Sequence, residues 1–125
     1  MSRKRKPVWG LIVATLLTSP AAATPLFETF AVCTGRFSAE MEHAWLMGEE
    51  AAEATNRRAV FISLLEATTP DDLRRHALSV RIDAKLAHSQ ILTQATFGSD
   101  DSMMVWALKR AKIGRDACET LLLDS

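Results

Sequence analysis

The sequence contains no tyrosine, only two cysteines, four prolines and five glycines among 125 residues, and no excess charge, since 15 basic residues balance 15 acidic ones. Two cysteines are too few to build a disulfide-rich scaffold. Hydrophobic residues make up 48% and charged residues 24%, which is typical of a folded globular domain and excludes a disordered chain. The length allows one small domain and excludes a multidomain enzyme.

Catalytic and cofactor motifs are missing as well. The chain has no Gly-x-Ser-x-Gly, no His-Glu-x-x-His and no glycine-rich phosphate loop. The two cysteines, Cys33 and Cys118, are 85 positions apart, which excludes the Cys-x-x-Cys-His motif of covalent haem attachment. The sequence therefore predicts a protein that is not an enzyme and has no resident cofactor.

The period-two pattern of β-strands is also missing, while apolar residues recur at three- and four-residue spacing in four segments, which predicts an all-α fold. One helix is expected to begin near residue 70, with Thr69 as its N-cap and Pro70 at its first position. Another is expected to begin near residue 101, after Gly98 as a helix stop. Small residues in the third and fourth segments predict that these two helices approach each other closely.

The first 23 residues have the layout of a secretory signal peptide. A basic run at 3–6 precedes an apolar stretch at 8–17 and a run of small residues at 18–23. The apolar stretch of 10 residues is well short of the ~20 that span a bilayer. Cleavage after Ala23 would leave a single helical domain at 24–125 in the periplasm, without a membrane anchor.

Cleavage also changes the charge balance. Residues 1–23 hold four of the 15 basic residues and no acidic one, so the remaining chain carries 11 basic and 15 acidic residues. Nucleic-acid binding relies on an excess of Lys and Arg, which this acidic domain lacks. We therefore expect no nucleic-acid partner.

The segment around Gly48 decides how the helices are arranged. If residues 26–67 formed one rod, the last helix would place Cys118 beside residue 58. At ~1.5 Å per residue, residue 58 lies about 37 Å from Cys33 along the rod. A disulfide requires Cα atoms within about 7 Å of each other, so in the rod the cysteines would pair only between two chains. If the chain turns at Gly48, four antiparallel helices run up, down, up and down, and the two cysteines meet. The sequence thus predicts a four-helix bundle closed by a Cys33–Cys118 disulfide, with the dimeric rod as the alternative.

In this bundle, the turn at 47–50 and the loop at 97–101 are expected to share one end and to gather acidic residues with histidine and methionine. Imidazole and thioether ligands suit copper or a borderline metal such as zinc, and bundles hold ligands from facing helices. Methionine on a helical stripe is also ordinary core filler. A copper- or zinc-handling bundle is therefore an alternative, with five candidate ligands: His43, His88, Met47, Met103 and Met104.

Glu40 and His43 form a Glu-x-x-His pair, which is half of the motif of di-iron helical bundles. The sequence contains no second copy, so a di-metal centre is not expected. We expect these two side chains to make a contact at the rim of the bundle.

Basic residues collect on the last two helices, and acidic residues on the first two. One explanation is solvated faces with weak ion pairs between neighbouring helices, each worth about 0–1 kcal/mol. The other is a bipolar surface that docks a partner protein or an anionic envelope component. The candidate interaction residues are Arg74, Arg81, Lys85, Lys109, Arg110 and Lys112.

Two segments and the second cysteine resemble a set of small exported proteins of alphaproteobacteria. The segments are 33–46 (CTGRFSAEMEHAWL) and 81–85 (RIDAK), and the cysteine is Cys118. The resemblance implies an exported helical protein, and it assigns neither an activity nor a site residue.

The sequence therefore predicts an exported, non-catalytic helical bundle with a binding or protein-interaction role in the periplasm. Its partner would be a periplasmic protein or an envelope component. One alternative is the metal-handling bundle, and another is a small enzyme or enzyme inhibitor. As an enzyme, the protein would need a Ser-His-Asp triad formed by residues that are distant in the sequence and come together in the fold.

The intact mass of the protein recovered from the envelope fraction, without chelator or reductant, tests export. We expect a chain that begins at Thr24, because small residues precede it as at signal-peptidase sites. We also expect it to be lighter than its reduced form by one pair of hydrogens, because the cysteines are paired. A mass that retains residues 1–23 would contradict the signal peptide.

Overall fold

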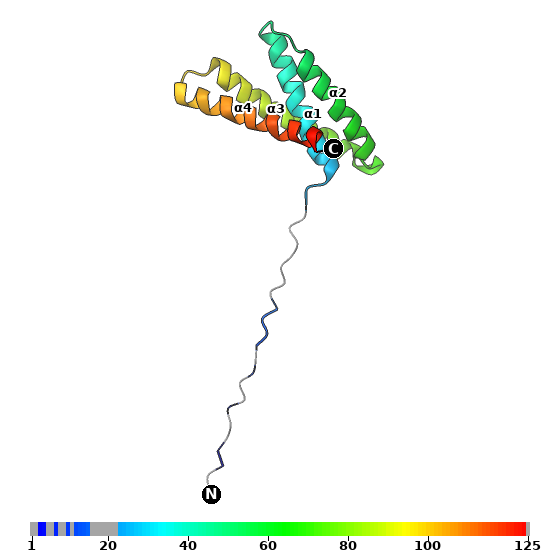
Figure 1. The fold of residues 1–125 in the computed structure, drawn as a ribbon, viewed down its shortest axis with the longest axis vertical. Helices are drawn as coiled ribbons and strands as arrows, with labels where there is room; N and C mark the ends of the chain where they lie inside the picture. The colour runs from blue at the N-terminus through cyan, green and yellow to red at the C-terminus, as the bar shows by residue number, and fades with distance from the viewer. Residues whose placement is uncertain (1–2, 5–6, 8–9, 11, 16–22, 125) are drawn as a thin grey trace.

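The computed structural model describes residues 3–4, 7, 10, 12–15 and 23–124, so the predicted signal peptide at 1–23 lies for the most part outside the described residues. The described residues form helices and contain no strand, which confirms the predicted all-α four-helix bundle. None of these helices is both long and apolar enough to cross a membrane. Figure 1 shows α1 (Leu26–Leu46), α2 (Ala52–Thr68), α3 (Arg74–Phe97) and α4 (Asp101–Leu123).

α1 ends in a tight turn at Gly48, whose φ of +70° is a left-handed conformation that glycine adopts without strain. The amide of Gly48 donates to the carbonyl of Trp45, and the amide of Glu49 donates to the carbonyl of Ala44. These bonds close the C-terminus of α1, and α2 then runs back along it. The alternative of one rod over 26–67 is therefore wrong, as is the dimer that depends on it.

The other helix boundaries follow the predictions in part. Asp100 caps α4, because its carboxylate accepts a hydrogen bond from an amide in the first turn at 3.1 Å. Gly98 ends α3 as expected. The start of α3 differs, since a short 3₁₀ turn, Asp71–Leu73, precedes it. The hydroxyl of Thr69 donates to the carbonyl of Leu65, so Thr69 completes the end of α2 and does not cap α3.

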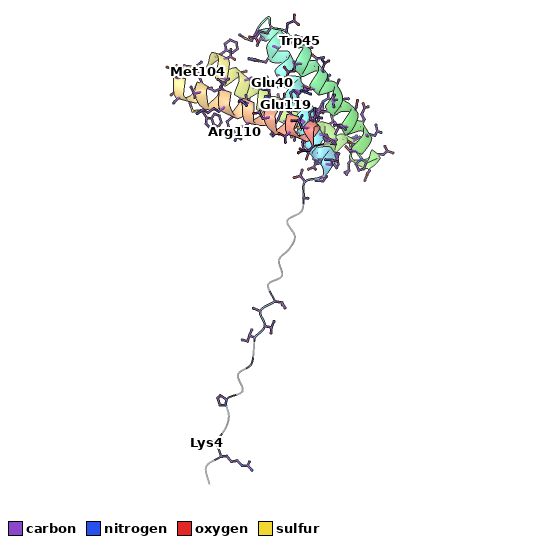
Figure 2. The ribbon with its side chains drawn as sticks, in the orientation of Figure 1. Lys4, Glu40, Trp45, Met104, Arg110 and Glu119 are labelled. Atoms are coloured by element: carbon purple, nitrogen blue, oxygen red, sulfur yellow. A yellow bond between two sulfur atoms is a disulfide. The ribbon has the colours of Figure 1, made fainter. Side chains whose placement is uncertain are left out.

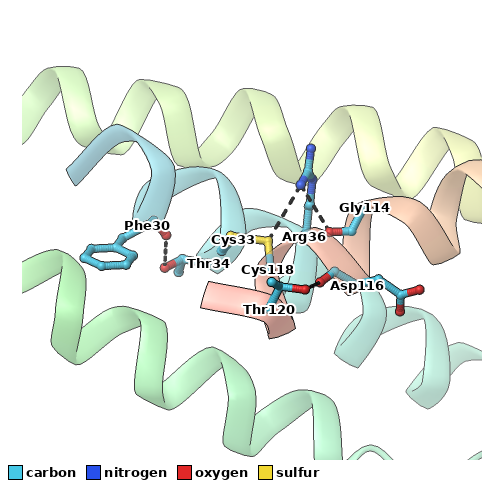
Figure 3. The surroundings of a disulfide bond; sticks show 8 residues. All are labelled: Phe30, Cys33, Thr34, Arg36, Gly114, Asp116, Cys118 and Thr120. Atoms are coloured by element: carbon cyan, nitrogen blue, oxygen red, sulfur yellow. Dashed lines mark hydrogen bonds between the residues drawn. A yellow bond between two sulfur atoms is a disulfide. The ribbon is translucent and has the colours of Figure 1, made fainter. Parts of the chain in front are cut away.

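The predicted disulfide between Cys33 and Cys118 is present (Figure 3), with the two Cα atoms 5.6 Å apart. Both cysteines are fully buried. The bond joins the first half of α1 to the last turns of α4, which are 85 positions away along the chain. Closing so long a loop restricts the unfolded chain, and this entropic constraint contributes about 4 kcal/mol to stability.

α1 lies between α2 and α3, whereas α4 packs on α3 and makes few contacts with α1. Figure 1 shows that the α1–α2 hairpin and the α3–α4 hairpin meet at the end that holds the C-terminus and diverge toward their turns. α1 and α3 run parallel, as the up-down-up-down topology requires, because their contacts follow the same order in both helices: Glu28 with His76, Glu40 with His88, and His43 with Thr96.

The hydrophobic core surrounds α1. In its larger cluster, Phe61 of α2 lies against two rings of α1, with centroids 6.1 Å from Phe30 and 5.8 Å from Phe37. A smaller cluster joins α1, α3 and α4 through Ala39, Leu92 and Ala111. Because both clusters include α1, this helix is the centre on which the other three depend.

The backbones of α1 and α3 are in close contact at Gly35. A Cβ added there would lie 2.4 Å from the carbonyl oxygen of Arg81 and 2.8 Å from the amide nitrogen of Lys85, so no side chain fits between the two backbones. The close approach expected between the third and fourth helices is looser. At Gly114 of α4, an added Cβ would meet only side-chain atoms, the nearest at 3.4 Å.

Replacing Gly35 with alanine is expected to destabilise the fold by about 1–3 kcal/mol, because the new methyl group collides with the backbone of α3. Gly114→Ala is the matched comparison. There the alanine gains about 1 kcal/mol of helix propensity, which offsets mild crowding, so we expect a change near zero. Chemical denaturation of the oxidised proteins measures both variants. A free energy of unfolding for Gly35→Ala at or above the wild-type value would contradict the close α1–α3 contact.

Candidate functional site

Three ionisable side chains from three helices meet inside the bundle, and we call them the Glu40 cluster. Nε2 of His88 in α3 donates to Oε1 of Glu40 in α1 at 2.8 Å, and Nη1 of Arg115 in α4 donates to the same oxygen at 3.0 Å. The side chains of His88 and Glu40 are only 3% and 14% exposed. His88 and Glu40 are therefore largely desolvated, while Arg115, 35% exposed, reaches them from the rim of the bundle.

Opposing effects set the pKa of Glu40. Burial raises the pKa, whereas the hydrogen bonds from His88 and Arg115, together with their positive charges, lower it. The hydrogen bonds and charges prevail, so the pKa of Glu40 lies below its usual value of 4.5. Glu40 is thus ionised at neutral pH and compensates the charge of Arg115 inside the bundle.

These partners differ from the predicted rim contact between Glu40 and His43. Nε2 of His43 lies 3.0 Å from Oγ1 of Thr96 in α3, and Glu40 pairs with His88 instead. Both side chains therefore find a partner on α3, although they are three residues apart on α1. The packing of α3 against α1 determines these contacts, whereas the three-residue spacing of Glu40 and His43 within α1 does not.

The three predicted methionine ligands lie at the ends of different helices. Met47 lies at the turn after α1, and Met103 and Met104 lie in the first turn of α4. Figure 2 shows these two ends, marked by Trp45 and Met104, well apart. Within the described part of the chain, no group of three or more His, Cys, Asp or Glu residues is placed to hold a metal ion. Of the two predicted histidine ligands, His43 contacts Thr96 and His88 contacts Glu40.

The six predicted interaction residues fall into two groups. Three form exposed ion pairs of the kind worth about 0–1 kcal/mol: Arg74 with Asp71, Lys85 with Glu42, and Lys112 with Asp116. The other three have no carboxylate within ion-pair distance among the described residues: Arg81, Lys109 and Arg110. Two of these unpaired residues, Arg81 and Arg110, line cavities.

The outer face of α3 carries a row of exposed apolar side chains that the sequence analysis missed. Leu78, Ile82 and Leu86 are 52%, 48% and 57% exposed, and their four-residue spacing places them in one line, which we call the α3 row. Beside Leu78 runs a groove of about 160 Å³ between α2 and α3, which Leu65 and Ala77 also line. The spacing of the α3 row was visible in the sequence, but periodicity cannot tell a buried stripe from an exposed one.

Arg81 lines the same groove and lies close to a second arginine. Burial, and then the charge of Arg58 in α2, lower the pKa of Arg81. Nε of Arg58 donates to Oγ of Ser38 at 2.9 Å. Glu66 also lines the groove, but it is not within ion-pair distance of either guanidinium. The groove thus combines an apolar lining with Arg81, which has no carboxylate within ion-pair distance among the described residues.

Comparison with protein-family models, with curated proteins and with solved structures gives no match for this chain. Its function is therefore argued from its own residues.

Replacing Glu40 with glutamine tests the cluster. We expect a loss of about 1–3 kcal/mol at neutral pH, because Arg115 and His88 lose their charged acceptor. Since folding lowers the pKa of Glu40, the carboxylate stabilises the fold above its unfolded value of 4.5, and this contribution is lost as the pH falls through the folded-state value. The difference in unfolding free energy between wild type and variant should therefore be constant above about pH 5 and shrink below it.

Glu42→Gln on the same helix is the control, because Glu42 forms an exposed ion pair with Lys85. Its effect should stay below about 1 kcal/mol. Urea denaturation between pH 3 and 8 measures both variants. A Glu40→Gln difference that stays constant at acid pH would contradict the lowered pKa of Glu40.

Proposed function

We propose that the protein is an exported, non-catalytic binding protein that docks an acidic, amphipathic segment of a partner protein on the outer face of α3. The observation that carries the proposal is the α3 row, which lies beside the unpaired Arg81 and the apolar groove. A segment with apolar side chains in one stripe and carboxylates next to it matches both features.

Burial of the exposed apolar side chains supports the affinity. Large apolar side chains that lie side by side on a surface mark interaction sites, whereas single ones do not. Complete burial of one such side chain contributes about 1.5–3 kcal/mol. Recognition of this kind, in which the apolar face of a partner helix fits a groove, reads residues at four-residue spacing.

Charge supports the choice of an acidic partner. Arg81 lines the groove and is repelled by the nearby Arg58, and an arriving carboxylate would pair with the guanidinium of Arg81, which has no such partner. A basic segment would add to the repulsion. Opposite charge also accelerates the encounter of the two proteins.

The periplasm is the proposed location. The predicted signal peptide, the Cys33–Cys118 disulfide and described helices that do not span a membrane agree with an exported protein. The partner would then be a periplasmic protein or a protein of the envelope that exposes an acidic segment there.

Photo-cross-linking in the host cell tests the docking face. A photoreactive amino acid at position 82 is expected to give a covalent adduct with one protein, at a peptide that contains Asp or Glu. Addition of Arg81→Glu should reduce the yield of the adduct by about tenfold or more, because it replaces an attractive charge with a repulsive one. Circular dichroism of the purified variant confirms that its helices are retained.

Two matched controls accompany the experiment. A photoreactive residue at Val105, which is exposed on α4, should give no such adduct. Lys109→Glu changes the charge by the same amount on α4 and should leave the yield from position 82 unchanged. Equal adducts from both positions, an adduct only with lipid, or a yield insensitive to Arg81→Glu would each refute the proposal.

A further inference from the structure

A second basic cavity, separate from the α2–α3 groove, lies where α1, α3 and α4 meet, and we call it the Arg36 pocket. Its volume is about 100 Å³. A cavity of ~10–15 Å³ is enough to hold one water molecule. The Arg36 pocket therefore has room for a tetrahedral anion together with part of its hydration shell. The pocket is lined by Arg36, His88, Ile91, Arg110, Ile113 and Gly114.

Arg36 is held in place by the protein and still has donors to spare. Its Nη1 donates to the carbonyl of Gly114 at 3.1 Å and approaches Sγ of Cys118 at 3.7 Å. Figure 3 shows the guanidinium reaching past the disulfide, with one nitrogen directed away from both acceptors. A guanidinium oriented in this way is prepared to bind a further acceptor at little entropic cost.

The charge in the pocket is not neutralised by the protein. Neither Arg36 nor Arg110 has a carboxylate within ion-pair distance among the described residues, and the nearby Glu40 is already engaged by His88 and Arg115. Burial, and then the charge of Arg110, lower the pKa of Arg36, as expected for two guanidinium groups that line the same pocket. An anion between them would relieve the repulsion of these like charges.

The missing side chain of Gly114 makes room for such an anion. A Cβ at this position would lie 3.4 Å from Nε of Arg36 and 3.4 Å from Cε1 of His88, in the space between these two groups. Ile91 and Ile113 supply the apolar part of the lining, with Ile91 partly buried and Ile113 58% exposed.

We infer that the Arg36 pocket binds a phosphate- or sulfate-type oxyanion, held by the guanidinium groups of Arg36 and Arg110. The anion is either free or part of a lipid headgroup. This inference does not depend on the docking proposed for α3, because the two sites share no residue.

Titration calorimetry with inorganic phosphate, against sodium chloride of equal ionic strength, tests the free anion. We expect saturable one-to-one binding to the wild-type protein. Arg110→Gln should weaken it by about tenfold or more, because a charge-assisted hydrogen bond is lost. Gly114→Ala should also weaken binding, because its methyl group enters the pocket, although the fold is retained.

Lys109→Gln is the control, since it removes the same charge from the neighbouring position, and it should change the affinity by less than about twofold. A second arm measures sedimentation with phosphatidylglycerol vesicles against phosphatidylcholine vesicles. Vesicle binding that Arg110→Gln abolishes, without binding of free phosphate, would support the headgroup as the source. The inference is refuted if neither ligand binds saturably, or if Lys109→Gln and Arg110→Gln weaken binding equally.

Discussion

Direct contact between the backbones of α1 and α3 at Gly35 determines the shape of this protein. The small side chains of Ala31 and Ala39 lie one turn before and after it on α1, and both are fully buried. Because α3 occupies this face, α2 and α4 pack on the outer sides of the central pair, and the two hairpins diverge toward their turns. A square bundle would cover the helices more evenly. The divergence instead leaves the α3 row exposed and opens cavities beside α1.

A seam of covalent and polar contacts links α1 to α4 where apolar contacts are few. On α1 the seam consists of Cys33, Arg36 and Glu40, which recur at three- and four-residue spacing and therefore share a face. On α4 they meet Cys118, the carbonyl of Gly114, and Arg115. The disulfide acts through the entropy of the unfolded chain, whereas a buried ion network contributes more to a unique register than to net stability.

Arginines line two of the cavities, although the domain after residue 23 carries more acidic than basic residues. A third cavity is acidic instead, with Glu49, Glu53 and Glu119 in its lining. Arg81 lines the α2–α3 groove and lies close to Arg58, and Arg36 and Arg110 line the Arg36 pocket. Each pair joins guanidinium groups from two helices without a neutralising carboxylate among the described residues. Two like charges held close together cost free energy when no anion is bound. For this reason we propose an acidic protein segment as the ligand at the α2–α3 groove and a single oxyanion as the ligand of the Arg36 pocket.

The residue pattern alone predicts the four helices and the start of the last one near residue 101, and it favours the turn at Gly48 and, with it, the cysteine pairing. Each of these depends on neighbours along the chain, or on the antiparallel order that short turns impose. The packing of the helices settles the partner of Glu40, the separation of the turn after α1 from the start of α4, and the exposure of the α3 row. Periodicity shows which residues share a face of a helix, but it does not show which other helix covers that face. That choice depends on how whole backbones fit together, and here it follows from the absence of a side chain at Gly35.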